Sequence, residues 1–202
     1  MILHELKLIF IHTPKCAGES IETALLGGPN RGYRGDPFEG TPDKHWGVRE
    51  WGSRYPVEFA SYFKFSVVRN PWDRFVSWVT YRDLRYARHR GSFQDRMRAD
   101  LSWRNRRFRR FLREKSFKRM LFLDDKLAVD FVIRFENLQN GFDEVCDKIA
   151  IPKKILPLSN KTDHRPYWEY YDDYLIKRVR KRFKFDIQYF DYEFRTVSMT
   201  EH

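Results

Sequence analysis

The stretch that decides the fold is "LIFIHTPKCAGES", residues 8–20 of the 202-residue chain. Four apolar residues precede His12, as expected of a strand that is buried on both faces of a sheet. A short turn with Pro14, Lys15 and Gly18 follows, and "SIETALL" (20–26) has the composition of a helix. A strand that passes through a short turn into a helix leaves amide groups at the positive end of the helix dipole, where anions bind. The stretch therefore predicts a site for a phosphate-type anion.

The same succession recurs further along the chain. A second apolar run, "FKFSVVR" (63–69), leads into Asn70 and Pro71, which are favoured at the N-cap and in the first turn of a helix. A third strand is expected over 127–136, followed by a helix over 138–149, and Asp172 is expected to cap a final helix. Strands that alternate with helices predict an α/β fold, with a P-loop-like parallel sheet flanked by helices.

Length and segment composition predict the domain organisation. A chain of 202 residues favours a single domain over residues 1–202. Residues 29–44 are rich in Gly, Pro and Asp and are expected to form an irregular loop, and an arginine-rich helical insertion is expected at about 82–125. In that insertion Phe108, Phe111 and Leu112 recur at helical spacing, so part of it should pack against other elements.

Charge and composition narrow the class of partner. The formal net charge of +11 and the pI near 9.7 favour an anionic partner, but do not choose among nucleic acid, an acidic polysaccharide, a phosphorylated cofactor and a membrane surface. The longest apolar runs are shorter than a membrane span and no signal peptide is recognised, so a cytoplasmic location is expected. The two cysteines, Cys16 and Cys146, are expected to be reduced thiols.

The residue types in the first turn suit an anion, but their order is not that of a Walker loop. Lys15 supplies a mobile charge, Gly18 allows close approach of the backbone, and Ser20 adds a hydroxyl donor. A Walker loop has the pattern G-x-x-x-x-G-K-[ST], whereas this turn has P-K-x-x-G-x-S.

Taken with "VVRNPWDRFVSWV", this order resembles the sulfotransferases that use 3′-phosphoadenosine 5′-phosphosulfate (PAPS). The P-K-x-x-G-x-S turn resembles their 5′-phosphosulfate loop, and the R-x-P-x-x-R-x-x-S pattern that begins at Arg69 resembles their 3′-phosphate motif. The likeness extends to "IRFENL" (133–138) and "KFDIQYFDYEF" (184–194), as in the carbohydrate-type branch and its bacterial relatives.

The resemblance implies that PAPS is the donor and that adenosine 3′,5′-bisphosphate is the product. It also implies roles for individual residues. The 5′-phosphosulfate would be held by Lys15 and by the amide or hydroxyl groups of Cys16, Ala17, Gly18, Glu19 and Ser20. Arg69 and Ser77 would hold the 3′-phosphate, and Arg74 is expected to pair with a carboxylate. Glu19 stands where the family has threonine, and its side chain is expected to turn away from the anion because carboxylates are stabilised at helix starts.

Sulfuryl transfer needs a cation beside the leaving oxygen and a base for the acceptor hydroxyl. Lys15 suits the first role, and a histidine suits the second because imidazole titrates near neutrality. Among six histidines, His45 resembles the family's base; it is expected to begin a helix over 45–55, close to one face with Glu50. Glu136 is expected either to orient Lys15 or the acceptor, or to form a buried ion pair. The spacing of potential ligands suggests no metal site.

The sequence thus favours a sulfotransferase that acts on an acceptor hydroxyl, with a carbohydrate as the expected acceptor. Residues 82–119 are either a clamp for an anionic glycan or a solvated basic face. One alternative is a basic nucleic-acid-binding module, in which arginines interleaved with Trp103, Phe108 and Phe111 grip phosphates and stack bases. Another is a nucleotide-dependent kinase that uses the turn for ATP; the missing Walker order argues against it.

Overall fold

Residues Leu8–Ile11 form a strand, β2, in which all four side chains are fully buried. It belongs to a four-stranded sheet with β1 (Ile2–Leu3), β3 (Phe63–Val68) and β6 (Phe131–Arg134), in the order β1-β2-β3-β6. β2, β3 and β6 run parallel, whereas β1 pairs with β2 antiparallel at the edge. The predicted parallel sheet is therefore confirmed.

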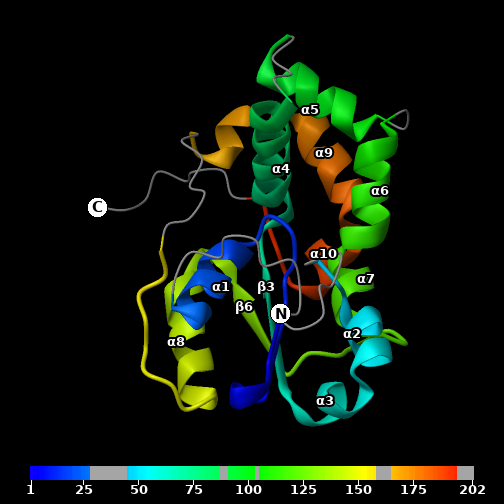
Figure 1. Ribbon diagram of the computed structural model, residues 1–202. Helices are drawn as coiled ribbons and strands as arrows, with labels where there is room; N and C mark the ends of the chain where they lie inside the picture. The colour runs from blue at the N-terminus through cyan, green and yellow to red at the C-terminus, as the bar shows by residue number, and fades with distance from the viewer. Residues whose placement is uncertain (28–44, 87–90, 103–104, 158–164, 195–202) are drawn as a thin grey trace. The chain divides into compact units, whose positions relative to one another are not determined.

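The structure, a computed structural model, describes residues 1–27, 45–86, 91–102, 105–157 and 165–194 (Figure 1). The chain forms two compact units, and each is described by itself. The first unit comprises Met1–Arg69 and Glu114–Lys161, and the second comprises Asn70–Arg113 and Thr162–His202. The predicted loop at 29–44 lies outside the described residues, and the expectation of one domain over residues 1–202 stays a prediction.

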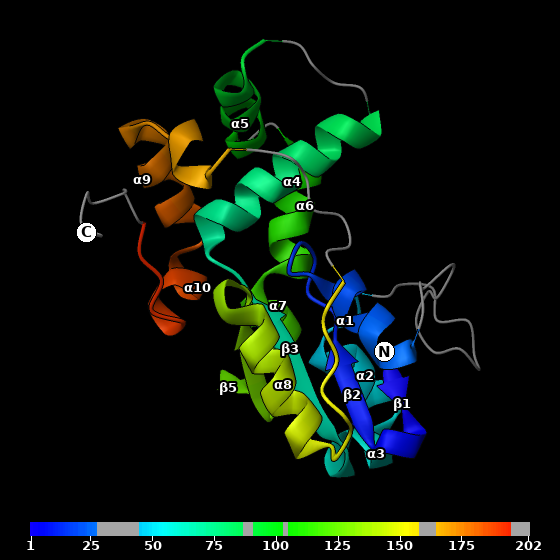
Figure 2. The ribbon, with the colours of Figure 1, turned by 90° about the vertical axis from the view of Figure 1, so that its left-hand side faces the viewer.

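Helices of the first unit cover both faces of its sheet (Figures 1 and 2). α1 (Gly18–Leu26) and α8 (Leu138–Lys148) lie on one face, and α2 (Val48–Arg54) and α7 (Phe117–Leu121) lie on the other. The unit also contains the short elements η1 (His4–Leu6), α3 (Pro56–Ser61), η2 (Phe135–Asn137) and the hairpin β4–β5 (Phe122–Leu123 and Lys126–Leu127). The flanking helices are thus confirmed.

Side-chain hydrogen bonds tie β2 and β3 together near their carboxyl ends. The Ser66 hydroxyl donates to the Ile11 carbonyl at 2.7 Å, and the Thr13 hydroxyl donates to the Val67 carbonyl. All the groups involved are buried. In parallel sheets the loops at these ends form ligand sites, so the bonds fix the part of the sheet where a site is expected.

The second unit is built of helices that begin as the sequence predicts. The carbonyl of Asn70 accepts a hydrogen bond from the Arg74 amide at 2.8 Å, and its side-chain oxygen accepts one from the Trp72 amide at 3.0 Å. The Asp172 carboxylate accepts one from the Leu175 amide at 2.8 Å. The elements are α4 (Pro71–Tyr86), α5 (Phe93–Leu101), α6 (Arg106–Lys115, whose last two residues belong to the first unit), η3 (Tyr167–Tyr170), α9 (Asp173–Arg182) and α10 (Lys184–Tyr189).

Two predicted elements differ from those observed. The third strand is only Phe131–Arg134, because Lys126–Leu127 turns back to pair with Phe122–Leu123 and the chain enters a 3-10 helix at Phe135. The helix expected over 45–55 begins at Val48. Its N-cap is Gly47, whose amide donates to the Glu50 carboxylate at 3.0 Å. His45 therefore precedes the helix instead of beginning it.

The described parts of the arginine-rich segment contain the helices α5, α6 and α7, and its aromatic residues are packed. Phe108 and Phe111 are 1% and 7% exposed, and the Phe108 ring lies 5.0 Å from that of Phe75 in α4. The side chain of Leu112 lies outside the described residues. Arg82 and Arg96 both bind the buried Asp83, at 2.7 and 2.6 Å. These two arginines therefore act inside the second unit.

Asp100 of α5 is the most strongly perturbed carboxyl group of this network. It is 1% exposed, pairs with Arg82, and accepts a hydrogen bond from Asn105 at 2.6 Å. Among the described residues nothing hydrogen-bonds its second oxygen. Burial raises the pKa of Asp100 from 3.8 to about 6; Arg82 opposes the rise and the charge of Asp83 adds to it.

This pKa makes stability depend on pH. Between pH 4 and 6 the folded chain holds a proton that the unfolded chain has lost, so the Asp100 contribution falls as pH rises and is constant above that range. A shift of this size corresponds to roughly 3 kcal/mol. The unfolded chain has already lost most of this proton at pH 4.5, so only part of the effect lies above that pH. Between pH 4.5 and 7, urea unfolding should show the free energy of unfolding of wild type falling by about 2 kcal/mol relative to that of Asp100→Asn. Parallel pH dependence in the two proteins would contradict the assignment.

Candidate active site

The turn after β2 has the backbone geometry of an anion site. Lys15 and Ala17 adopt positive φ angles, 67° and 56°, and α1 begins at Gly18. Alternation of right- and left-handed residues points successive amide groups into one concavity, and the helix dipole adds positive potential there. Among the described residues nothing accepts a hydrogen bond from the amides of Ala17 and Gly18. Ser20 lies in the first turn of α1 and is 4% exposed.

Gly18 packs against the buried ring of His12. Its φ is not in the left-handed region, and the two positive φ angles of the turn belong to Lys15 and Ala17. A Cβ at Gly18 would lie 2.0 Å from Nε2 of His12, so any side chain here would collide with that ring. Close packing against His12 therefore requires glycine at this position, and close approach of its backbone to an anion stays a prediction.

Arg69 is brought to the turn. Its Nη1 donates to the Lys15 carbonyl at 3.1 Å, and its guanidinium stacks 4.0 Å above the Phe135 ring. Arg69 is 8% exposed, so it is held from two sides at the end of β3. The structure therefore places two of the predicted site residues, Lys15 and Arg69, in direct contact.

His45 is anchored to the residue that begins the same turn. Its Nδ1 lies 3.0 Å from the backbone carbonyl of His12, and its own carbonyl accepts a hydrogen bond from Lys115 at 2.8 Å. A carbonyl can only accept, so the proton of the neutral ring is on Nδ1 and the lone pair is on Nε2. This tautomer is the one that can take a proton at Nε2.

Glu50 does not share a helical face with His45 as expected. Besides accepting from the Gly47 amide, it pairs with Arg119 at 2.6 Å. It therefore caps α2 and links this helix to α7. Glu136 is exposed, so the expectation that it forms a buried ion pair is wrong.

The buried carboxylate near the turn is Glu22, which the sequence reading missed. It is 0% exposed, and its Oε1 lies 2.7 Å from Nδ1 of His12, which is 4% exposed. Glu19, the carboxylate singled out from the sequence, is exposed. The spacing of Gly18 and Glu22 could have predicted this pairing. The two residues are four apart and therefore lie on one face of α1, where both can contact His12.

Cys16 is a packed residue of the turn. Its side chain is 1% exposed and its thiol donates to the Pro14 carbonyl at 3.6 Å. Cys146 is also buried, and burial raises the pKa of its thiol. Both are free thiols, as expected.

The remaining residues of the second motif lie on α4 in the second unit. Ser77 is 6% exposed. Arg74 is 1% exposed and lies 3.9 Å from the Asp186 carboxylate and 5.1 Å from the centre of the Phe111 ring. The carboxylate pairing expected for Arg74 is confirmed, whereas the role of Ser77 stays a prediction.

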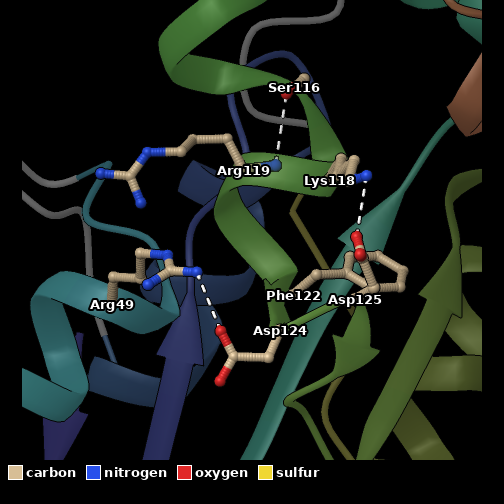
Figure 3. Close-up of a pocket in the computed structure, with 7 residues that line it drawn as sticks. All are labelled: Arg49, Ser116, Lys118, Arg119, Phe122, Asp124 and Asp125. Atoms are coloured by element: carbon tan, nitrogen blue, oxygen red, sulfur yellow. Dashed lines mark hydrogen bonds and ion pairs between the residues drawn. The ribbon is translucent and has the colours of Figure 1, made fainter.

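An open pocket of about 460 Å³ in the first unit is separate from the predicted residues (Figure 3). Its charged side chains pair with one another across it: Arg49 with Asp124 at 3.5 Å, and Lys118 with Asp125 at 2.8 Å. The lining is Arg49, Ser116, Lys118, Arg119, Phe122, Asp124 and Asp125. Because its charges largely cancel, this pocket is a poorer site for a dianion than the turn.

In the described part of the chain, no helix is long and apolar enough to cross a bilayer. Within the same ranges, no three His, Cys, Asp or Glu residues gather where they could hold a metal ion.

One solved structure and one family model resemble this chain. A solved structure, the crystal structure of a sulfotransferase from Alicyclobacillus acidocaldarius, matches with 19% identity and a TM-score of 0.32. The match covers 68% of this chain and 59% of that one, so the chain spans less than two thirds of that protein. No curated protein matches. The model described as "Sulfotransferase family" matches residues 1–193, and the chain therefore belongs to the sulfotransferase family.

Proposed function

We propose that this chain transfers a sulfuryl group from PAPS to a hydroxyl group of a carbohydrate acceptor. The observation that carries the proposal is that one residue, His12, contacts both the turn and His45. His12 begins the anion-binding turn, and its carbonyl holds the imidazole of His45 at 3.0 Å in the tautomer of a base. Anion site and base thus meet at one residue of one unit.

The turn suits the 5′-phosphosulfate of PAPS. The left-handed backbone at Lys15 and Ala17 gathers amide donors at the start of α1, and Arg69 fixes the carbonyl of Lys15 at 3.1 Å. Charge-assisted hydrogen bonds from such donors are the strong ones. Lys15 and the amides of Cys16–Glu19 would therefore hold the group. Ser20 would contribute its hydroxyl, because its amide donates to the Ala17 carbonyl at 3.0 Å. The assignment of Arg69 and Ser77 to the 3′-phosphate rests on their sequence motif.

When bound, PAPS supplies an activated sulfuryl group with the 5′-phosphate as its leaving group. Lys15 and the amides neutralise negative charge at the leaving oxygen. Nε2 of His45 takes the proton of the acceptor hydroxyl, while the Nδ1 hydrogen bond to His12 stabilises the positive charge that develops on the ring. Both roles need only groups of the first unit.

Nucleic-acid binding is the weaker candidate. Base stacking needs exposed aromatic rings, but Phe108 and Phe111 are buried in the second unit. Arg82 and Arg96 are bound to Asp83, and Arg98 pairs with Asp172. Three arginines of α6 are exposed: Arg106, Arg109 and Arg110. Binding of an anionic glycan therefore remains the hypothesis for this segment.

Binding of adenosine 3′,5′-bisphosphate, compared with ATP, tests the donor assignment. The bisphosphate should raise Tm in a saturable way and bind at least 10-fold more tightly than ATP in calorimetry, because only it offers a phosphate to both motifs. Equal stabilisation by both nucleotides, or by neither, would contradict PAPS as the donor.

Arg69→Gln should separate recognition of the 3′-phosphate from shaping of the turn. A hydrogen bond to a charged group is worth about 1.5–3 kcal/mol, so affinity for the bisphosphate should fall about 10–150-fold. Affinity for adenosine 5′-phosphate should fall much less, and Arg134→Gln, at an exposed position, serves as control. An equal loss for both nucleotides in calorimetry would mean that Arg69 only holds the Lys15 carbonyl.

A further inference from the structure

A buried histidine–carboxylate pair lies where β2 gives way to α1, and the proposed chemistry does not use it. His12 and Glu22 are 4% and 0% exposed, and their Nδ1 and Oε1 atoms are 2.7 Å apart. Since the carboxylate accepts, Nδ1 of His12 carries the proton. Burying two ionisable groups is costly and is weak evidence of stabilisation, so the pair invites a functional explanation.

His12 contacts both halves of the candidate site. Its carbonyl binds Nδ1 of His45, and the two rings meet edge to face with their centres 4.6 Å apart. On the other side its Nε2 packs against Gly18, where no Cβ would fit. The His12 ring therefore packs against the first residue of α1 on one side and against the His45 ring on the other.

Glu22 is the group that fixes this orientation. It is anchored in the second turn of α1, four residues after Gly18, so its hydrogen bond draws the ring against the first turn of the same helix. Without the carboxylate, the ring could rotate about χ2 or change tautomer. Either change would alter the surface against which His45 packs.

We infer that His12 and Glu22 form a positioning pair that holds His45 in the Nδ1–H tautomer and in register with the anion-binding turn. The inference rests on the proposed function for its kinetic consequences, but the tautomer itself does not depend on any activity. Glu22 acts through His12, and His12 acts through His45.

Kinetics of Glu22→Met test the pair, because methionine fills the buried space but cannot accept the hydrogen bond. We expect kcat for sulfuryl transfer to fall about 10–100-fold while affinity for adenosine 3′,5′-bisphosphate changes less than about 3-fold, since small misplacements of a catalytic group cost this much. Glu22→Gln keeps an acceptor and should recover most of the loss. Asp100→Asn, a buried carboxylate of the second unit, should retain kcat within about 2-fold.

A double-variant cycle distinguishes positioning from general destabilisation. In a His45→Asn background, Glu22→Met should not lower the residual rate further, because the group through which it acts is gone. The same fold-loss in both backgrounds, or wild-type kcat in folded Glu22→Met, would overturn the inference. Absence of transfer in wild type would instead count against the proposed function.

NMR of the imidazole nitrogens tests the tautomers directly, without a need for turnover. In wild type the test does not depend on whether any variant folds. Two-bond ¹H–¹⁵N spectra of ¹⁵N-histidine-labelled wild type should show His12 and His45 as Nδ1–H tautomers at neutral pH. Glu22→Gln should keep this pattern, and folded Glu22→Met should show a mixture for His45. Finding His45 of wild type as the Nε2–H tautomer would overturn the inference without any variant.

Discussion

His45→Asn is expected to lower kcat for sulfuryl transfer by about 10²–10⁴-fold, the usual contribution of a positioned base. Asparagine places an amide near the position of Nδ1, so the hydrogen bond to the His12 carbonyl can be kept while the basic Nε2 is lost. Affinity for adenosine 3′,5′-bisphosphate should therefore stay within about 3-fold of wild type. Steady-state transfer and calorimetry on one preparation measure both quantities.

His4→Gln is the matched control for His45. His4 is exposed, lies in the same unit, and hydrogen-bonds the Tyr62 hydroxyl at 3.0 Å. Its variant should keep wild-type kcat. Full activity of His45→Asn would exclude His45 as the base, and a parallel loss of nucleotide affinity would mean that the substitution damages the turn.

Gly18→Ala should both destabilise the chain and disable the turn. The added Cβ would lie 2.0 Å from Nε2 of His12, and that ring cannot swing aside easily because Glu22 holds its Nδ1 at 2.7 Å. Overpacking of this kind costs about 1–3 kcal/mol. For a chain of this length that corresponds to roughly 2–12 °C in Tm. Displacement of the ring should also weaken binding of the bisphosphate.

Gly52→Ala provides the comparison within the same unit. Its Cβ would lie 3.4 Å from the Phe59 ring, an ordinary contact, so alanine should be neutral or should stabilise α2 by up to about 1 kcal/mol. Urea unfolding of the two variants should therefore give changes of opposite sign or very different size. A Gly18→Ala protein as stable as wild type would show that the His12 ring is not fixed as described.

Patterns local in sequence predicted the fold well. The apolar runs at β2 and β3 gave parallel strands because a strand covered on both faces of a sheet is rich in apolar residues. Asn70 and Asp172 cap helices as predicted because capping depends on a few neighbouring residues. The third strand was predicted too long because pairing of Leu127 with Phe122 depends on a hairpin, which the apolar pattern does not encode.

The site was only partly predictable, for a related reason. The turn and His45 follow from residue types in a fixed order, but the pairing of His12 with Glu22 depends on how β2 meets α1. Glu19 stands out in the sequence because it breaks the family pattern, whereas nothing local distinguishes Glu22 from an ordinary helical residue. Likewise, the arginines of the inserted segment suggested a surface that binds anions. In the structure, however, Arg82 and Arg96 form ion pairs with Asp83.

The most direct test of the central claim is transfer of ³⁵S from labelled PAPS to a panel of glycans, phenols and peptides. Wild type should label at least one hydroxyl-bearing acceptor, with glycans expected first, and should release adenosine 3′,5′-bisphosphate in equal amount. His45→Asn should do neither above about 1% of that rate. No labelled acceptor from wild-type protein that binds the bisphosphate, or equal labelling by His45→Asn, would contradict a sulfuryl transfer that uses His45 as its base.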